Sequence, residues 1–236
     1  MRTPVCEGET MMMNENCPCK KKNCIRREKC DECKEHHAKS KARLPVYCKR
    51  ENRQDLPNVS PSKPPKTTRE QFISAFSEAY SVRELKKSDI PEIFSLCKEN
   101  ALYYQYCPPF VTMENISDDM TALPPGKTEA DKFYVGYFDG EKLIAVMDFI
   151  RGYPEEETAF IGFFMTDRSV QNTGTGSGII NELCRFLPWF GFLRVRLAWV
   201  KGNPQAEHFW LKNGFEATGT THDTNGHTVV SAERNL

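Results

Sequence analysis

The amino-acid sequence predicts an α/β domain of the α+β type, in which helices flank a central sheet, preceded by a small cysteine-rich module. From about residue 80 onward, short apolar runs bounded by turn residues alternate with segments of 3.6-residue periodicity. Seven of the ten cysteines fall within the first 48 residues. Residues 50–67 contain four prolines and almost no large apolar side chains, so we expect a semi-extended linker between the two parts.

The length and the membrane signals limit the possibilities further. A chain of 236 residues has room for one ordinary domain with small additions. No apolar run approaches the roughly 18 residues of a membrane span, and the first residues lack the apolar stretch of a signal peptide. We therefore expect a cytoplasmic protein without a membrane partner. Residues 1–13 are expected to form a disordered tail.

The first half of the main domain shows clear capping and stripe patterns. Ser88 precedes an apolar stripe at Ile90, Ile93 and Cys97, which is typical of a capped amphipathic helix. The expected elements are a helix over 68–79, a strand over 80–85, the helix capped by Ser88, an aromatic loop over 103–109 and a helix from Thr112 to about 123.

The second half is marked by turns. Asp139-Gly140 and Asn225-Gly226 are strong hairpin signals between apolar runs. The expected elements are strands over 133–138, 142–150 and 157–165, a helix over 179–187, a strand over 193–200, a helix around Trp210, and strands over 218–222 and 228–232. The predicted order is therefore β-α-α-β-β-β-α-β-α-β-β.

A glycine-rich turn between the strand over 157–165 and the following helix is the best functional signal. It reads Gln171-x-x-Gly174-x-Gly176. Glycine lets the backbone approach an anion closely, and the free N–H groups of the helix then face its charge. The spacing differs from the dinucleotide fingerprint and from the phosphate loop that ends in Gly-Lys-Ser/Thr. By themselves, these glycines could also merely tighten a turn.

This turn is followed by Asn203-x-x-Ala206 and Gly214-Phe215. In that order and spacing, the chain resembles the GCN5-related N-acetyltransferase (GNAT) family over roughly residues 80–236. The resemblance implies a mixed, mostly antiparallel sheet, and we place the N-acetyltransferase domain at 68–236. It also implies acetyl-CoA as cosubstrate and direct attack of a neutral amine on the thioester.

The resemblance further implies where acetyl-CoA binds. The pantetheine arm would pair with the strand before the turn, and the pyrophosphate would lie on backbone N–H groups of the turn. Asn203 would bond to the CoA arm beyond the sheet. The implied cofactor residues are Phe164, Met165, Thr166, Gln171, Asn172, Thr173, Gly174, Thr175, Gly176, Ser177 and Asn203.

The catalytic groups are less clear from the sequence. Glu157 starts the cofactor-binding strand and Asp148 lies on the neighbouring one, so either carboxylate is a candidate general base. Trp210 stands where many family members carry the tyrosine that protonates the leaving thiolate. Since an indole N–H is not an acid at neutral pH, Trp210 is expected to be a core aromatic. Tyr104 and Tyr106 are the nearest alternative acids along the sequence.

The N-terminal cysteines suggest a metal module over residues 14–49. Without an export signal, clustered cysteines favour a metal over disulfides, and zinc prefers four thiolate or imidazole ligands. A subset of Cys17, Cys19, Cys24, Cys30, Cys33, His36 and Cys48 would supply them. The alternative is a disordered basic tail with incidental cysteines.

Charge is divided unequally along the chain. Residues 14–53 hold 13 Lys and Arg against 6 Asp and Glu, whereas residues 54–236 hold 18 against 24. The basic module lacks interleaved aromatic side chains that stack on bases, so nucleic acid is not the expected partner. We expect a small-molecule amine as acceptor. A protein or peptide acceptor, a non-catalytic CoA sensor, and either a monomer or a homodimer remain alternatives.

Overall fold

A computed structural model describes residue 35, residues 67–224 and residues 226–236 of the protein. Pro61–Leu236 form a single compact unit, and all elements below belong to it. The expected tail over 1–13 and nearly all of the cysteine module and of the linker lie outside the described residues.

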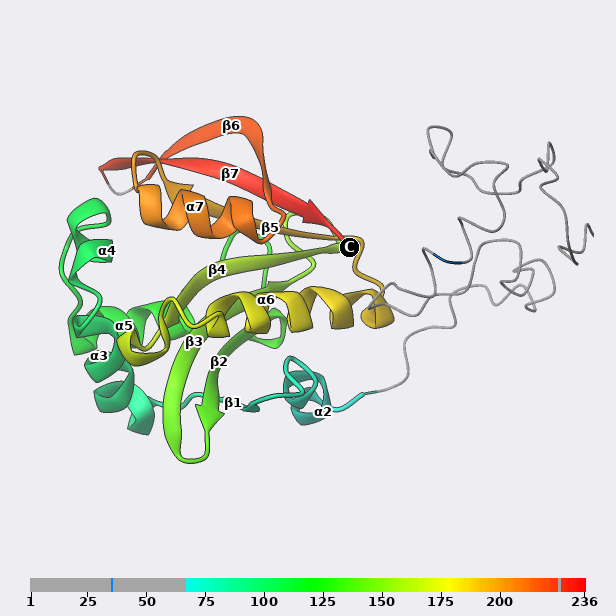
Figure 1. The fold of residues 1–236 in the computed structure, drawn as a ribbon, viewed down its shortest axis with the longest axis horizontal. Helices are drawn as coiled ribbons and strands as arrows, with labels where there is room; N and C mark the ends of the chain where they lie inside the picture. The colour runs from blue at the N-terminus through cyan, green and yellow to red at the C-terminus, as the bar shows by residue number, and fades with distance from the viewer. Residues whose placement is uncertain (1–34, 36–66, 225) are drawn as a thin grey trace, which may run out of the picture. The chain divides into compact units, whose positions relative to one another are not determined.

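The unit is built on a mixed sheet of seven strands in the order β1-β2-β3-β4-β5-β7-β6 (Figure 1). The strands are β1 (Ser81–Glu84), β2 (Lys132–Asp139), β3 (Lys142–Arg151), β4 (Thr158–Thr166), β5 (Arg194–Val200), β6 (Glu216–Thr224) and β7 (His227–Asn235). All described neighbours are antiparallel except β4 and β5, which are parallel. This confirms the mixed, mostly antiparallel sheet.

Helices cover both faces of the sheet. They are α2 (Arg69–Ser74), α3 (Ile90–Lys98), α4 (Ala101–Tyr106), α5 (Met113–Thr121), α6 (Thr175–Phe186) and α7 (Pro204–Lys212), with 3-10 turns η2 (Lys87–Asp89), η3 (Glu129–Asp131), η4 (Arg168–Val170) and η5 (Leu187–Phe190). α2, α6 and α7 pack into one apolar cluster, and α3 and α5 into a second on the opposite face. In Figure 1, α6 and α7 lie in front of the strands.

Alternation along β2 explains how one strand serves both clusters. Phe133, Val135 and Tyr137 point into the α2–α6 cluster, whereas Tyr134 and Phe138 point into the α3–α5 cluster. Seven successive residues of this strand are buried, as is typical of a strand covered on both faces.

The pairing of β4 with β5 is short, and this creates the site. Only four residue pairs join the two strands, from Thr158↔Arg194 to Ile161↔Leu197. Beyond Ile161, β4 continues to Thr166 without a partner on that side. A β-bulge lies at the same point, since Asp148 pairs with Phe163 and Phe149 with Ile161, which leaves Gly162 as the extra residue.

Two local expectations were wrong. Ser88 does not cap a helix: it lies inside the 3-10 turn η2, and α3 begins after Asp89 without a side-chain cap. The expected aromatic loop is helical up to Tyr106, as α4. Thr112 caps α5 by accepting a hydrogen bond from the N–H group of Asn115, and Thr68 caps α2 in the same way through Gln71.

Candidate active site

A cavity of about 590 Å³ opens where β4 and β5 separate. The C-terminal half of β4 forms one wall and Leu197–Val200 of β5 the other. The start of α6, the helix α7, the end of α4 and the beginning of β7 complete the lining. Of the expected cofactor residues, it includes Phe164, Met165, Thr166, Gln171, Asn172, Gly174, Gly176, Ser177 and Asn203.

The open edge of β4 gives the cavity a row of backbone groups. Pairing with β5 ends at Ile161, so the N–H and C=O groups of the following residues that point away from β3 have no strand partner. Buried backbone groups need hydrogen bonds. An extended ligand lying along this edge can therefore pair with β4 as an additional strand would.

The glycine-rich turn has the geometry of an anion cradle. Gly174 is the N-cap of α6 and has φ of 94°, a left-handed conformation that favours glycine. The N–H groups of Gly176 and Ser177 lie in the first helical turn and find no acceptor in the part of the chain that the structure describes. A Cβ at Gly176 would lie 3.2 Å from the ring of Phe209.

Thr173 and Thr175 lie in the turn but are not part of the cavity lining, and their role toward the cofactor stays a prediction. The hydroxyl of Thr173 donates to the carbonyl of Val170 at 2.7 Å and lies 2.8 Å from the hydroxyl of Thr175. These contacts hold the turn in shape, while the glycines leave room for the ligand.

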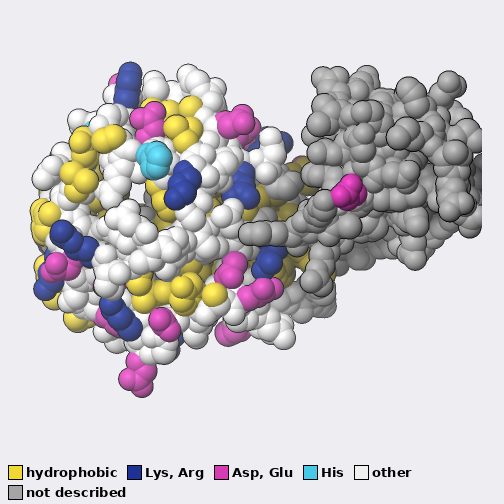
Figure 2. All heavy atoms as spheres, in the orientation of Figure 1, with side chains coloured by type: hydrophobic (Ala, Val, Ile, Leu, Met, Phe, Trp, Pro, Cys, Tyr) yellow, Lys and Arg dark blue, Asp and Glu magenta, His cyan; other side chains and the backbone are white. Residues whose placement is uncertain are grey.

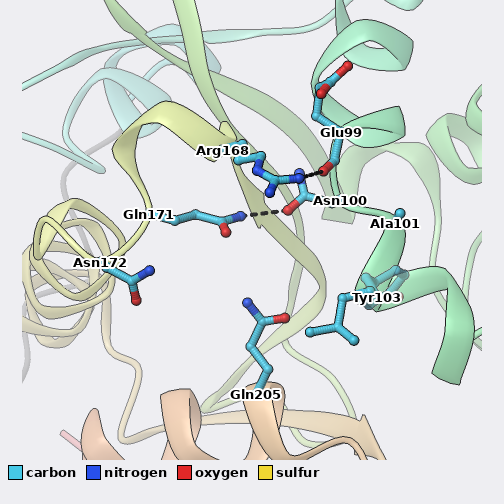
Figure 3. A pocket seen from close by; sticks show the side chains of 9 residues that line it. Glu99, Asn100, Ala101, Tyr103, Arg168, Gln171, Asn172 and Gln205 are labelled. Carbon is cyan, nitrogen blue, oxygen red and sulfur yellow. Dashed lines mark hydrogen bonds between the residues drawn. The ribbon is translucent and has the colours of Figure 1, made fainter.

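A polar network ties the turn to α4. The Nε2 of Gln171 donates to the side-chain oxygen of Asn100 and, at 3.3 Å, to the carbonyl of Thr166. Asn100 also donates to the Thr166 carbonyl at 3.2 Å. Figure 3 shows Gln171 and Asn100 meeting across a neighbouring hollow of about 290 Å³, with Arg168 close to the backbone of Glu99. The glutamine of the motif thus fixes the position of the turn.

Asn203 is buried and caps α7. Its Oδ1 accepts the N–H of Ala206 at 3.1 Å, which explains the Asn-x-x-Ala spacing as an N-cap. Its Nδ2 makes no hydrogen bond with the described residues and remains available to a ligand.

Asp148 lies beside the bulge in β4. An ideal Cβ on Gly162 would lie 2.6 Å from its Oδ2, so the carboxylate occupies the space that a side chain at Gly162 would fill. Its Oδ1 lies 2.8 Å from the Nζ of Lys132, which is only 5% exposed. Burial raises the pKa of the Asp148 carboxyl, and the charge and hydrogen bond of Lys132 oppose that rise.

Glu157 lies elsewhere. It is exposed and immediately precedes β4, at the end where β4 and β5 are still paired. Its carbonyl accepts the N–H of Leu193 at 2.8 Å, and the residue is not part of the cavity lining. The two candidate bases are therefore separated by their position along the sheet, and only Asp148 lies beside a residue that lines the cavity.

Trp210 is packed as a core aromatic. It is 8% exposed, and its ring centroid lies 4.9 Å from that of Phe209, 5.1 Å from Phe215 and 6.1 Å from Phe164. It still lines part of the cavity. Its surroundings are those of a packing residue.

Sequence reasoning missed the tyrosine that reaches the cavity. Tyr104 and Tyr106 do not line it, whereas Tyr103 does. Burial raises the pKa of Tyr103, which makes it a weaker acid. Recognising 101–106 as a helix would have placed Tyr103 and Cys107 on one face, since they are four residues apart.

Lys132 was also missed, because a lysine at the start of a strand usually points to solvent.

Among the described residues, no cluster of three or more His, Cys, Asp or Glu side chains could hold a metal ion. In the same residues, no helix has the length and apolar character needed to cross a membrane. On the face drawn in Figure 2, acidic and basic side chains are interspersed.

Comparison with known proteins agrees with this fold. The model of the Acetyltransferase (GNAT) family matches residues 92–215, more than half of the chain. An acetyltransferase from Thermus thermophilus has a TM-score of 0.55 at 20% identity, covering 67% of this chain and 97% of that chain. A Vibrio cholerae spermidine N-acetyltransferase, in complex with CoA and spermine, has a TM-score of 0.51 at 17% identity, with coverage of 67% and 96%. No curated protein matches the chain.

The family model covers β4 and β5, between which the sheet opens, and the glycine-rich start of α6. The chain belongs to the GNAT family. It is an N-acetyltransferase that uses acetyl-CoA.

Proposed function

We propose that the protein transfers the acetyl group of acetyl-CoA to a primary amine of a small molecule, by direct attack of the neutral amine on the thioester. The observation that carries this proposal is the position of the Asp148 carboxylate against Gly162, at the point where β4 leaves β5. A partly buried carboxylate that could act as a base therefore lies beside the open strand edge that a CoA arm would occupy.

The cofactor would bind in two parts. Backbone groups of Phe164 to Thr166 would pair with the pantetheine arm, and the N–H groups of the turn from Gln171 to Ser177 would hold the pyrophosphate. The Nδ2 of Asn203 would donate to the arm. The thioester would then lie near the bulge, where the unpaired backbone of Gly162 can polarise its carbonyl.

Asp148 would accept the proton that the amine loses. A general base works best when its pKa lies near the working pH, and burial moves the pKa of Asp148 in that direction. The carboxylate would take the proton directly or through one water. Glu157 remains a weaker alternative, because it lies at the paired end of β4.

The leaving thiolate needs no acid from Trp210. Its indole cannot supply a proton at neutral pH, and its ring is occupied in packing. We infer that the CoA sulfur leaves either as the unprotonated thiolate or after taking a proton from water. Tyr103, which lines the cavity, would donate a hydrogen bond to it.

A contact between α4 and β7 closes one side of the cavity, and this favours a small acceptor. The end of α4 and the start of β7 touch through Cys107 and His227, at 3.8 Å between Sγ and Nε2. This contact narrows the space left beside the CoA arm. Polyamines, which the Vibrio cholerae protein binds, are reasonable first compounds to test.

The test is an acceptor screen with the purified full chain. Primary amines, polyamines, amino acids and peptides are incubated with acetyl-CoA, and products are detected by the mass of one added acetyl group. Acetylated small amines are the expected products. Modification of peptides alone would overturn the small-molecule assignment. If the protein bound CoA but acetylated none of these compounds, the proposed acceptor class would be wrong, and only the fold and the use of CoA would stand.

A further inference from the structure

The contact between Cys107 and His227 joins two segments that are far apart in the sequence. Cys107 is the C-cap of α4 and His227 is the first residue of β7. Their Sγ and Nε2 atoms lie 3.8 Å apart, and both side chains line the large cavity. In Figure 1, the start of β7 and the helix α4 lie at the same end of the unit.

We propose that Cys107, activated by His227, is a site of covalent modification by small electrophilic alkylating agents, and that an adduct there obstructs the cavity. The reactivity of the thiol follows from its own contacts. Only the obstruction of acceptor binding rests on the proposed function.

The two side chains have complementary roles. An imidazole nitrogen within reach of a thiol can take its proton as the sulfur attacks, which is the arrangement that activates cysteine nucleophiles. Tyr103, one turn earlier on α4, interacts electrostatically with Cys107. In the reaction, a bond forms between Sγ and the carbon of the reagent, the bond from that carbon to its leaving group breaks, and the thiol proton passes to Nε2 of His227.

The other described cysteines provide an internal comparison. Cys97 and Cys184 are buried, and burial raises the pKa of each thiol to about 11. Neither lines the cavity. Cys107 is partly exposed and is the one cysteine of the described residues with an imidazole contact. Among the three described cysteines, modification is therefore expected to favour Cys107.

The other ring nitrogen of His227 has no such contact. Its Nδ1 is buried and has no hydrogen-bond partner among the described residues. Among the described residues, no hydrogen bond from Nδ1 therefore holds the ring in place. Its remaining polar contact within the described chain is the thiol of Cys107.

The adduct would lie away from the cofactor cradle. Asn100 at the start of α4 contacts the turn through Gln171, whereas Cys107 lies at the other end of α4. Added atoms on Cys107 would fill the space between α4 and β7. We expect the loss of acceptor turnover to be larger than the loss of CoA affinity.

The experiment measures alkylation of the full chain by iodoacetamide, with the rate at each cysteine read from peptide masses. Cys107 should react at least about tenfold faster than Cys97 and Cys184 in the same digest. His227→Phe should slow Cys107 by about tenfold and leave the two buried cysteines unchanged. As the folding control, the far-ultraviolet circular dichroism spectrum of the variant should match that of the unaltered protein. If His227→Phe does not fold, His227→Gln is the second variant.

Equal rates at all three cysteines, or an unchanged Cys107 rate in the folded His227 variants, would overturn the proposal. These rates need no acceptor, so they are independent of whether the proposed function holds. In an acetyl-transfer assay, whatever activity Cys107→Ser retains should be insensitive to the reagent. Equal inhibition of Cys107→Ser and the unaltered protein would exclude Cys107 as the site of obstruction.

Discussion

Asp148 combines burial, a close positive charge and contact with the bulge in β4. If it is the base, Asp148→Asn should lower kcat by roughly 10²–10⁴ while CoA affinity stays within about twofold. Calorimetry with CoA and single-acceptor kinetics measure the two effects. Glu157→Gln is the matched control and should change kcat little. If kcat fell in Glu157→Gln while Asp148→Asn stayed active, Glu157 and not Asp148 would be the general base.

The pH dependence of turnover should report the same carboxyl. Asp148 acts when deprotonated, and its pKa is raised above that of an ordinary aspartate, so activity should fall as pH drops through this raised value. Lys132 opposes the rise. In Lys132→Met, the acid limb of the pH profile should therefore move to higher pH, and Lys132→Arg should restore it. One acceptor is used throughout, so its own ionisation is common to all profiles. An identical limb in a folded Lys132→Met protein would contradict the assignment.

Trp210 separates packing from chemistry. Trp210→Phe should reduce the free energy of unfolding by roughly 1–3 kcal/mol, because the smaller ring loses contacts with Phe209 and Phe215. Denaturant unfolding measures this, and most of kcat should survive in the folded fraction. A fully folded variant with kcat lowered by about a hundredfold, the usual size of an acid–base contribution, would instead give the indole N–H a direct role.

The residues predicted from the sequence and those missed differ in what identifies them. Gly174, Gly176 and Asn203 were predictable because a turn and an N-cap have local signatures. Lys132 and Cys107 were not, because their importance depends on partners 16 and 120 residues away. Such partners are set by the sheet register and by the packing of α4, which no local pattern encodes.

At the scale of elements, α6 and its glycine turn allow a direct test of cofactor binding. Gly176→Val should weaken CoA binding by about tenfold or more, about 1.4 kcal/mol, because the added atoms meet Phe209 and Thr166 and fill the cradle. Isothermal calorimetry measures the affinity. Gly178→Ala is the matched control, because a Cβ there meets nothing within 4 Å. If both variants bound CoA with equal affinity, the pyrophosphate would not bind at this turn.

Strands and hairpins were predicted well because their turns are explicit. Asp139-Gly140 and Asn225-Gly226 fixed both hairpins to within a few residues. α4 was missed for a physical reason: it has six residues and is followed by Pro108-Pro109, so its own helix propensity is small. Side-chain contacts of Tyr103 with Phe163 support it instead, and these arise only in the folded domain.

At the scale of the whole molecule, we expect the N-acetyltransferase domain to need α2 and little of the chain before it. A fragment of residues 68–236 should fold, whereas 80–236 should not, because it lacks Phe72, Ile73 and Phe76, which are buried in the core. Losing one such phenylalanine costs about 3–5 kcal/mol, a large part of a typical domain's stability. Circular dichroism and thermal unfolding of the two fragments decide it. A folded, cooperative 80–236 fragment would place the boundary after α2.

The zinc prediction also concerns the whole chain and stays a prediction from the sequence. Metal analysis of the full chain should give about one zinc per molecule, and the 68–236 fragment should contain none. Equal zinc content in both proteins would contradict a site over residues 14–49.

The short pairing between β4 and β5 has a mechanical consequence. The sheet consists of two plates, β1–β4 and β5–β7–β6, that are joined along only part of their common border. A CoA arm lying in the gap would hydrogen-bond to the unpaired part of β4 and so join the two parts of the sheet. The free protein should therefore open there first, and the cosubstrate should act as a missing strand that raises the melting temperature. At a concentration about one hundred times its Kd, it would contribute about 2.7 kcal/mol to the stability of the folded state.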